Sequence, residues 1–177
     1  MDVTDGAGLR RAVGGLSGRG PLTVVAYVAG VFDWAPAHRA DPSVWERLID
    51  VNLTAAATLT TLILPALIEA APSTLLYIGS GAAHQAYPGN AAYVASKQGL
   101  AGLADAVFLD VRDHDVKVSL ISPGLVAAGA GLTAPVDPAA LLRPEDVAAA
   151  VRFVVTFPVR GCPTQIRLQP QRTPGPG

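Results

Sequence analysis

Residues 73–124 read STLLYIGSGAAHQAYPGNAAYVASKQGLAGLADAVFLDVRDHDVKVSLISPG, and this stretch decides the fold. It begins with an apolar run at residues 73–79, continues with a segment suited to a long helix at 91–112, and returns to an apolar run at 116–121. Short, nearly uninterrupted apolar runs are typical of strands that are buried on both faces of a parallel sheet. A helix between two such runs predicts a strand–helix–strand unit whose strands point in the same direction.

The same alternation extends to both sides of this unit. The other predicted elements are a strand at 22–28, a helix at 41–70 capped by Asp41 and bent near Pro65, a cap at Asn90 for the helix 91–112, a helix opened by residues 143–146, and a strand at 164–168. This order predicts one α/β domain over residues 1–168, with a parallel sheet covered by helices on both faces. The tail 169–177, QPQRTPGPG, is rich in Pro, Gly and polar residues and is predicted to be disordered.

The composition excludes several classes of function. The chain has 177 residues, of which 50% are hydrophobic and 15% charged, and its net charge is −1. Because there is no basic run and no excess of positive charge, we predict that it does not bind nucleic acid. The single cysteine, Cys162, cannot form an internal disulfide, which fits a reducing compartment and a cytoplasmic location.

One stretch, residues 51–68, contains no charged residue and requires a test for membrane insertion. A membrane-spanning helix needs about 20 predominantly apolar residues, whereas this run contains Asn52, Pro65 and four threonines. We interpret it as a helix buried in protein, with a subunit interface as one alternative, and predict no membrane association. The polar, acidic start MDVTDGAGLRR is unlike a signal peptide, and none is expected.

Tyr93 and Lys97 stand four residues apart in a chain with only four tyrosines and two lysines. On a helix, residues at this spacing lie on the same face, one turn apart. A tyrosine is a poor proton donor and acceptor at neutral pH because its pKa is about 10, and a nearby ammonium group lowers that pKa. The pair therefore predicts a tyrosine general acid–base, with a surface lysine beside a half-buried tyrosine as the alternative.

Other residues are predicted to meet this pair at one edge of the sheet. Ser80 follows the preceding strand, thirteen residues before Tyr93, and ligands of open α/β sheets bind beyond the carboxyl ends of the strands. Asn52 places a hydrogen-bond donor and acceptor inside an apolar helix; the alternative is that it bonds a neighbouring carbonyl group and bends the helix. Pro123 and Gly124 end the next strand, where bare backbone permits a close approach by a ligand.

With these residues in place, the sequence resembles the short-chain dehydrogenase/reductase family. The motif YVASK (93–97), with its serine thirteen residues upstream, follows DVNLT (50–54) and precedes SLISPGLV (119–126), in that family's order and spacing. The likeness extends from DVTD (2–5) to RPEDVAAAV (143–151), which is nearly the whole chain, and is strongest to small bacterial oxidoreductases. It implies a Rossmann-like, doubly wound parallel sheet.

The resemblance also implies roles for individual residues. Tyr93 would protonate a carbonyl oxygen during hydride transfer, and Lys97 would lower the pKa of Tyr93 and bind the nicotinamide ribose. Ser80 would orient the carbonyl group, and Asn52 would hold a water molecule in a proton relay behind Lys97. The cofactor, NAD or NADP, would also contact Asp2, Val3, Tyr27, Ala29, Gly30, Pro123, Gly124 and Val126. No metal site is predicted.

The glycine-rich turn that such a fold places beneath the pyrophosphate is not expected in this chain. Gly14, Gly18 and Gly20 match a GxxxGxG spacing, but a helix-like segment precedes them and a strand follows, which reverses the required context. Gly6 and Gly8 have no strand before them. We therefore expect a partial Rossmann-like sheet that lacks the first two strand–helix units, on the order of 60 residues.

A missing neighbour would affect the strand at 22–28. That strand would become an edge of the sheet, and its unpaired backbone groups would be a template for association with another chain. We therefore expect a homo-oligomer, or pairing of this edge with another chain.

Three functions remain open at this point. The first is an NAD(P)-dependent carbonyl reductase or alcohol dehydrogenase acting on a small molecule; the second is a non-catalytic remnant, a pseudoenzyme or assembly partner. The third is proton transfer by Tyr93 without a dinucleotide. The candidates for contact with substrate are Phe32, Trp34, His84, Tyr87 and the loop 126–142, with plain packing, an exposed loop or disorder as the alternatives.

Overall fold

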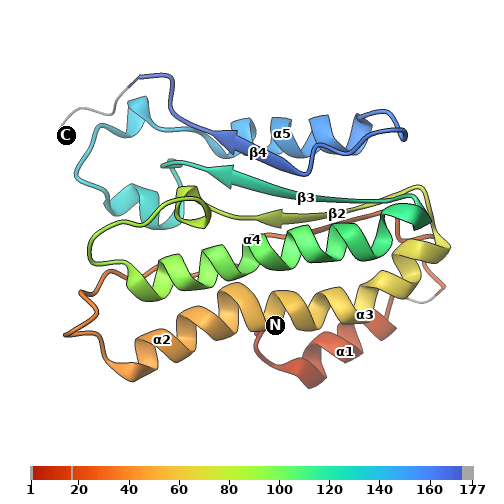
Figure 1. Cartoon of the computed structure of the whole chain (residues 1–177), viewed down its shortest axis with the longest axis horizontal. Coiled ribbons are helices and arrows are strands. Elements are labelled where there is room, and N and C mark those ends of the chain that lie inside the picture. Colours follow the sequence, from red (N-terminus) through yellow and green to blue (C-terminus); the bar gives the residue numbers. More distant parts are fainter. Residues whose placement is uncertain (1, 17, 173–177) are drawn as a thin grey trace.

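The apolar runs form a four-stranded, fully parallel sheet with the strand order β1-β2-β3-β4. The computed structural model of the chain describes residues 2–16 and 18–172. Its strands are β1 Val24–Tyr27, β2 Ser73–Ile78, β3 Val116–Pro123 and β4 Gln165–Leu168. Strands that follow one another in sequence are neighbours in the sheet, with helices between them (Figure 1). The predicted α/β class and parallel sheet are confirmed.

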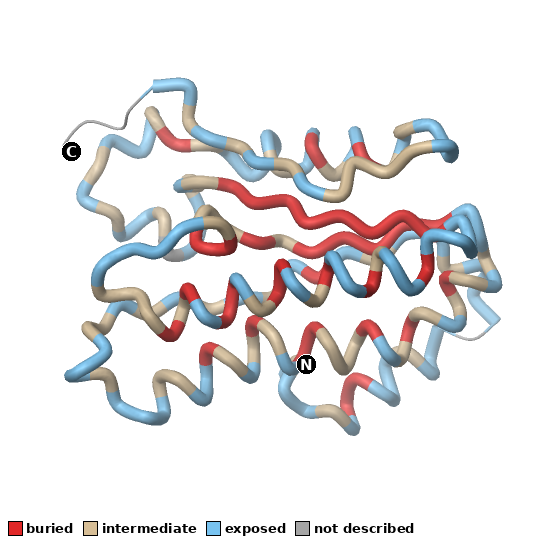
Figure 2. Tube along the Cα trace, in the orientation of Figure 1, coloured by how far each residue is buried: buried red, intermediate tan, exposed pale blue. Residues whose placement is uncertain are grey.

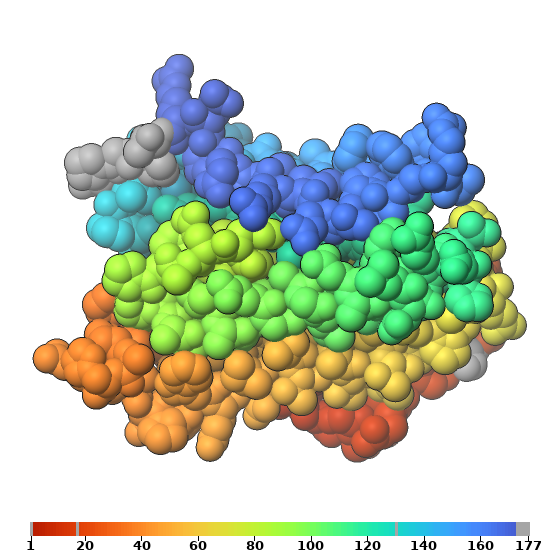
Figure 3. All heavy atoms as spheres, in the orientation of Figure 1, coloured from red at the N-terminus to blue at the C-terminus, as the bar shows by residue number. Residues whose placement is uncertain are grey.

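Helices cover both faces of this sheet, as the apolar character of the strands requires. The α-helices are α1 Gly6–Gly14, α2 Pro42–Ile49, α3 Ala55–Glu69, α4 Ala91–Val111 and α5 Pro144–Thr156. On one face α3 and α4 pack over β2 and β3, and Figure 3 shows α4 lying beside the helical run from α2 to α3. On the other face α5 packs over β2 and β3. The two central strands are almost completely buried (Figure 2).

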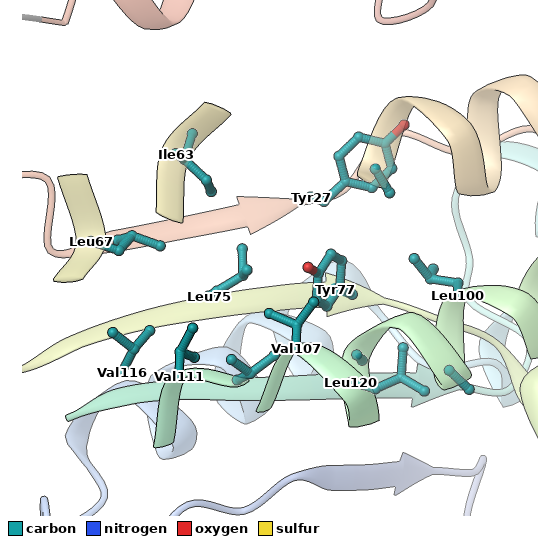
Figure 4. Packing of buried hydrophobic residues seen from close by; sticks show 14 of the residues in the cluster. Tyr27, Ile63, Leu67, Leu75, Tyr77, Leu100, Val107, Val111, Val116 and Leu120 are labelled. Carbon is teal, nitrogen blue, oxygen red and sulfur yellow. The ribbon is translucent and has the colours of Figure 1, made fainter. Parts of the chain in front are cut away.

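The larger core lies between the sheet and the pair α3 and α4 (Figure 4). Tyr77, on β2, is fully buried in it, and its hydroxyl lies 2.6 Å from the hydroxyl of Thr60 on α3. Tyr27, on β1, donates a hydrogen bond of 2.5 Å to the carbonyl of Val51. Burial raises the pKa of both tyrosines to about 12, so that they stay neutral in the core.

The helix predicted at 41–70 is interrupted, but not where the sequence suggested. Asp41 caps it by accepting a 2.8 Å hydrogen bond from the Ser43 amide, as predicted. A π-helical turn, η1 Asp50–Thr54, then separates α2 from α3, whereas Pro65 lies inside α3. The run Pro42–Glu69 is long and apolar enough to cross a membrane by length and composition alone, and 33% of its most apolar window is buried. Core helices of globular proteins meet the same criterion.

Three other predicted boundaries differ. Strand β3 continues through Pro123, although proline has no backbone N–H. The last hydrogen bond to β4 is donated by the Gly124 amide to the Leu168 carbonyl at 2.8 Å, so Pro123 is not needed as a donor. Asn90 stands at the N-cap of α4 but makes no side-chain capping bond. The loop 126–142 contains short 3-10 turns and is closed by a parallel bridge between Val126 and Leu142. Residues 169–172 of the predicted disordered tail are in neither helix nor strand, and residues 173–177 lie outside the described residues.

Strand β1 is an edge of the sheet, as predicted, because only β2 pairs with it among the described residues. The Thr23 carbonyl accepts from the Thr74 amide at 2.8 Å, so the backbone groups of the alternate residues Val24 and Ala26 face away from β2. Val24 and the adjoining Val28 are 41% and 67% exposed. This open edge can accept a strand from another chain.

Ala26→Lys is expected to shift the chain from self-associated species toward the monomer, because a lysine on an edge strand opposes pairing with another strand. Sedimentation velocity at several protein concentrations measures this shift. Ala149→Lys, on the exposed side of α5, adds the same charge away from the edge and should leave self-association unchanged. A wild-type chain that is a monodisperse monomer of high thermal stability would contradict the prediction.

Candidate active site

The catalytic residues predicted from the sequence lie where the strands end. The arrowheads of the sheet point to the end of the molecule at which α4 begins (Figure 1). Ser80 follows β2 by two residues, and Tyr93 and Lys97 lie in the first two turns of α4. The parallel sheet therefore directs the end of one strand and the start of the next helix to the same edge, as ligand sites of open α/β sheets require.

Tyr93 and Lys97 form a close pair in which the lysine is buried and the tyrosine is partly buried. The Lys97 ammonium nitrogen lies 5.8 Å from the centre of the Tyr93 ring, and the lysine is only 5% exposed. It donates a hydrogen bond of 3.1 Å to the carbonyl of Ile78, at the end of β2. Burial lowers the pKa of Lys97 to about 8, which still leaves most of the ammonium protonated near neutral pH.

The effect of Lys97 on the pKa of Tyr93 is not the dominant one in the structure. Burial raises the pKa of Tyr93, and the side chain of Ser80 acts in the opposite direction through a hydrogen bond. The reason is that the Lys97 ammonium hydrogen-bonds to the Ile78 carbonyl instead of the phenol, so desolvation of the phenolate dominates. Tyr93 is therefore a proton donor at neutral pH.

Ser80 is held so that its hydroxyl hydrogen is available. Its backbone is extended, and its Oγ accepts a 3.2 Å hydrogen bond from the Ala82 amide at the start of η2 Gly81–Ala83. Because that bond uses an oxygen lone pair, the O–H remains a donor. The structure brings the hydroxyls of Ser80 and Tyr93 together, as the sequence predicted.

Asn52 is completely buried in η1 and connects two distant segments. Its Oδ1 accepts from the Val31 amide at 2.9 Å, and its Nδ2 donates to the Val31 carbonyl at 2.9 Å and to the Ser96 hydroxyl at 3.0 Å. Both donors of the carboxamide are thus used, and only Oδ1 keeps a free lone pair. π-Helical turns occur often at functional sites, and this one points Asn52 at the segment next to Lys97.

Asn52→Ala is expected to lower the free energy of unfolding by about 3 kcal/mol, because the buried Ser96 hydroxyl and two part-buried backbone groups of Val31 lose their partner. Urea denaturation measures the loss. Asn90→Ala is the matched control: its buried Oδ1 has no hydrogen-bond partner among the described residues, so the change should stay within about 0.5 kcal/mol. Equal stability of the two variants would show that the Asn52 network does not hold this edge together.

Among the other predicted cofactor residues, Gly30 lies beside Lys97. A methyl group in place of its hydrogen would lie 3.3 Å from Asn52 Oδ1 and 3.4 Å from the Lys97 nitrogen, so bare backbone faces the ammonium group. A similar approach at Gly124 is taken by the chain itself, where an added methyl would meet the Gln169 Oε1 at 2.7 Å. The side chain of Tyr27 belongs to the core, which leaves only its backbone to contact a ligand.

The remaining predicted cofactor residues lie in three places. Asp2 accepts hydrogen bonds from the amide and hydroxyl of Thr4, and Val3 packs against the larger core. Ala29 packs against that core beside Gly30, and Val126 begins the loop after β3. A separate hollow of about 130 Å³ lies at the opposite end of the strands, against Val116 and Lys117, and is not part of this site.

Sequence reasoning missed two further contacts at this edge. His84 Nε2 lies 2.9 Å from the hydroxyl of Ser122, which is buried in β3, so the turn after Ser80 is attached to the next strand. Burial lowers the pKa of His84, which keeps the imidazole neutral. Phe32 packs edge-to-face on Tyr93, with ring centres 5.0 Å apart. His84 and Phe32 were both predicted as candidates for contact with substrate. Their contacts with Ser122 and Tyr93 were not predicted.

The donor set fits the nicotinamide half of a dinucleotide better than its phosphate half. Lys97 has three N–H donors and one acceptor in the chain, and Gly30 leaves space beside it. Gly14 ends α1, and Gly18 and Gly20, with φ angles of 81° and 101°, lie between α1 and β1. A phosphate-binding glycine turn follows a strand and opens a helix, so these glycines do not form one.

A parallel α/β sheet with a serine, a tyrosine and a lysine beyond its strand ends is a Rossmann-like arrangement. The sequence model of the short chain dehydrogenase family matches residues 1–137, and the chain belongs to this family.

Individual relatives agree with this assignment. The chain is 33% identical over 125 residues to an uncharacterised NAD-dependent oxidoreductase of Mycobacterium tuberculosis, a match that covers 70% of this chain and 46% of the relative. It is 32% identical over 127 residues to the trans-4-hydroxycyclohexanecarboxylate dehydrogenase of Sinomonas cyclohexanicum, covering 71% and 49%. The chain thus spans about half the length of the curated relatives it matches.

Solved structures share the fold over more of their length. Serine dehydrogenase from Escherichia coli superimposes with a TM-score of 0.83 at 28% identity, covering 95% of this chain and 73% of that one. A metagenomic short-chain oxidoreductase in complex with NADP gives a TM-score of 0.79 at 28% identity, covering 97% and 72%.

Proposed function

We propose that the chain forms the catalytic, nicotinamide-facing part of an NAD(P)-dependent oxidoreductase that interconverts a carbonyl compound and an alcohol. The observation that carries this proposal is the meeting of Ser80, Tyr93 and Lys97 at the carboxyl edge of the sheet. The NAD-dependent relative and the NADP complex of a family member support the cofactor class. The choice between NAD and NADP is made after a strand that is not among the four described here.

Each residue has a defined part in the reduction direction. A reduced nicotinamide held beside Gly30 and Lys97 would supply the hydride for the carbonyl carbon. Ser80 donates a hydrogen bond to the carbonyl oxygen, and Tyr93 transfers its phenolic proton to that oxygen as the C=O π bond breaks. The products would be the alcohol, the oxidised nicotinamide and the Tyr93 phenolate. The ammonium of Lys97 stabilises this phenolate until a proton from solvent restores the phenol.

The structure favours reduction near neutral pH. Burial raises the pKa of Tyr93, so the side chain carries the proton that reduction consumes. Asn52 anchors the Val31 segment beside Gly30 and the Ser96 turn of α4, and in a proton relay it could contribute only as an acceptor through Oδ1. Its two roles, structural and relay, are both part of the proposal.

A non-catalytic role is the second candidate, and one observation favours it. The backbone groups of Val24 and Ala26 on β1 have no strand partner among the described residues, so this edge can accept a strand from another chain. Such a chain would act as an assembly partner, joined to a second copy or a relative through the β1 edge or the uncharged face of α3. A cytoplasmic location fits both candidates.

Isotope transfer distinguishes the two candidates. The chain is incubated with a panel of neutral ketones and reduced NAD or NADP that carries deuterium at the transferred position, and the alcohols are analysed by mass spectrometry. Deuterium at the carbinol carbon, formed by wild type and lost in Tyr93→Phe, supports the oxidoreductase. A folded chain that forms no deuterated alcohol from any ketone with either cofactor contradicts it and favours the non-catalytic role.

A further inference from the structure

Three exposed aromatic side chains lie on the two segments that follow β1 and β2. Phe32, Trp34 and Tyr87 are 42%, 61% and 40% exposed. Phe32 and Trp34 belong to the segment after β1, and Tyr87 belongs to the segment after β2, so two strand ends contribute them. Exposed aromatic residues that gather at one place on a surface mark a binding site more often than residues scattered singly.

The rings of Phe32 and Tyr87 contact Tyr93 and the residue that follows Ser80. Phe32 packs edge-to-face on the ring of Tyr93 itself. A methyl group on Gly81, the residue after Ser80, would lie 2.9 Å from the Tyr87 hydroxyl oxygen. The Tyr87 hydroxyl also accepts a 2.5 Å hydrogen bond from the amide of Gln85. The rings of Phe32 and Tyr87 are therefore held beside Tyr93 and Gly81.

The indole of Trp34 is held most firmly. Its Nε1 donates a 3.3 Å hydrogen bond to the Pro88 carbonyl, and the Ala35 amide donates to the Gly89 carbonyl at 2.8 Å. Gly89 has a φ angle of 75°, and a methyl group there would lie 2.5 Å from the indole nitrogen. One side of the indole thus rests on a position that requires glycine, and the rest of the ring faces solvent.

The two segments that carry these rings offer almost no charge. Residues 28–36 contain a single charged side chain, Asp33, and it pairs with Arg47 on α2. Residues 79–90 contain no lysine, arginine, aspartate or glutamate. Lys97 is only 5% exposed, and its hydrogen bond goes to the Ile78 carbonyl. A carboxylate lying against the aromatic rings would therefore find no cation on either segment.

We propose that Phe32, Trp34 and Tyr87 bind the ring of a neutral, apolar carbonyl compound or alcohol whose oxygen reaches Ser80 and Tyr93, and that this surface rejects carboxylate substrates. The inference rests on the proposed function and names its substrate class. The apolar area supplies affinity without a charge, and an unpaired carboxylate would lose hydration without gaining a partner. Two compounds in the names of similar proteins, trans-4-hydroxycyclohexanecarboxylate and serine, each carry a carboxylate. We expect both to bind poorly to this chain.

The test compares two probes of the same shape, acetophenone and 4-acetylbenzoate, which differ by one carboxylate. Dissociation constants are measured by saturation-transfer NMR and tryptophan fluorescence on the full chain without cofactor. Acetophenone is expected to bind at least about tenfold more tightly than 4-acetylbenzoate, and Trp34→Ala and Phe32→Ala are each expected to weaken it about tenfold. Leu109→Ala, which removes a 63% exposed side chain of α4, is the matched control and should change nothing.

A second variant keeps the test decisive if Trp34→Ala does not fold. Tyr87→Arg adds a guanidinium beside Ser80 and is expected to reverse the preference in favour of 4-acetylbenzoate. Equal or tighter binding of 4-acetylbenzoate by wild type, no saturable binding of acetophenone, or an equal effect of Leu109→Ala would overturn the inference. Acetophenone binding without hydride transfer would instead contradict the proposed function, while efficient turnover of 4-acetylbenzoate would contradict only the inference.

Discussion

Tyr93→Phe is expected to reduce hydride transfer by about a thousandfold while leaving the fold intact. General acid–base catalysis by a positioned side chain contributes on the order of 10² to 10⁴ in rate, and the variant removes the only proton donor that the account assigns to the carbonyl oxygen. The phenyl ring remains, so the edge-to-face contact with Phe32 is kept. The rate of deuterium transfer to a ketone at saturating cofactor measures the effect.

Two comparisons make this result specific. Ser80→Ala removes a hydrogen bond but no proton, and a loss of about tenfold to a hundredfold is expected. The melting temperature of Tyr93→Phe should match that of the wild type, because Tyr93 is only partly buried and its ring is retained. A Tyr93→Phe variant that retains more than about a tenth of the wild-type rate would show that another group protonates the carbonyl oxygen.

Lys97→Met is expected to make the chain more stable near neutral pH although it removes a functional residue. Burial lowers the pKa of Lys97 from 10.5 to about 8, which corresponds to about 3 kcal/mol of unfavourable free energy while the lysine is charged. Methionine has a similar length and no charge. Loss of the hydrogen bond to the Ile78 carbonyl offsets about 1 kcal/mol, so a net gain of about 2 kcal/mol is expected.

The stability difference between Lys97→Met and the wild type is expected to depend on pH. Below about pH 8 the lysine is protonated in both the folded and unfolded states, and its cost is constant. Between about pH 8 and 10.5 the folded chain has released this proton while the unfolded chain still binds it, so wild-type stability rises with pH. The advantage of Lys97→Met should therefore shrink over this window.

Urea denaturation of both proteins at several pH values between about 7 and 10 measures the difference. The difference between the two proteins removes the contribution of Tyr27 and Tyr77, whose raised pKa values affect both equally. If Lys97→Met is less stable than the wild type at neutral pH, burial of the charged lysine does not lower the stability of the fold. The prediction then fails.

Local patterns in the sequence were sufficient to predict the sheet and the catalytic edge. The apolar runs around residues 73–79 and 116–121 specified parallel strands because only the interior of such a sheet accepts them. The i, i+4 spacing placed Tyr93 and Lys97 on one helix face, and a strand end placed Ser80 beside them.

Features that depend on distant partners could not be predicted in the same way. The π-helical turn at Asp50–Thr54 accompanies hydrogen bonds from Asn52 to Val31 and Ser96, which lie 21 and 44 residues away. The pairing of His84 with Ser122 spans 38 residues.

The direction in which the pKa of Tyr93 is shifted could not be predicted from the sequence either. It depends on how far the ring is buried and on the hydrogen bond of Lys97 to a strand carbonyl, neither of which a helical spacing contains.

We expect Gly30, Tyr93 and Lys97, at the carboxyl edge of the sheet, to bind a reduced nicotinamide. Titration of the full chain with NADH and with NADPH, followed by nicotinamide fluorescence, tests it most directly. We expect saturable binding of NADH, of NADPH or of both. Binding should be retained in Arg112→Ala, at the far end of α4, and lost in Lys97→Ala. A folded chain that binds neither cofactor, or that binds equally well without Lys97, would contradict it.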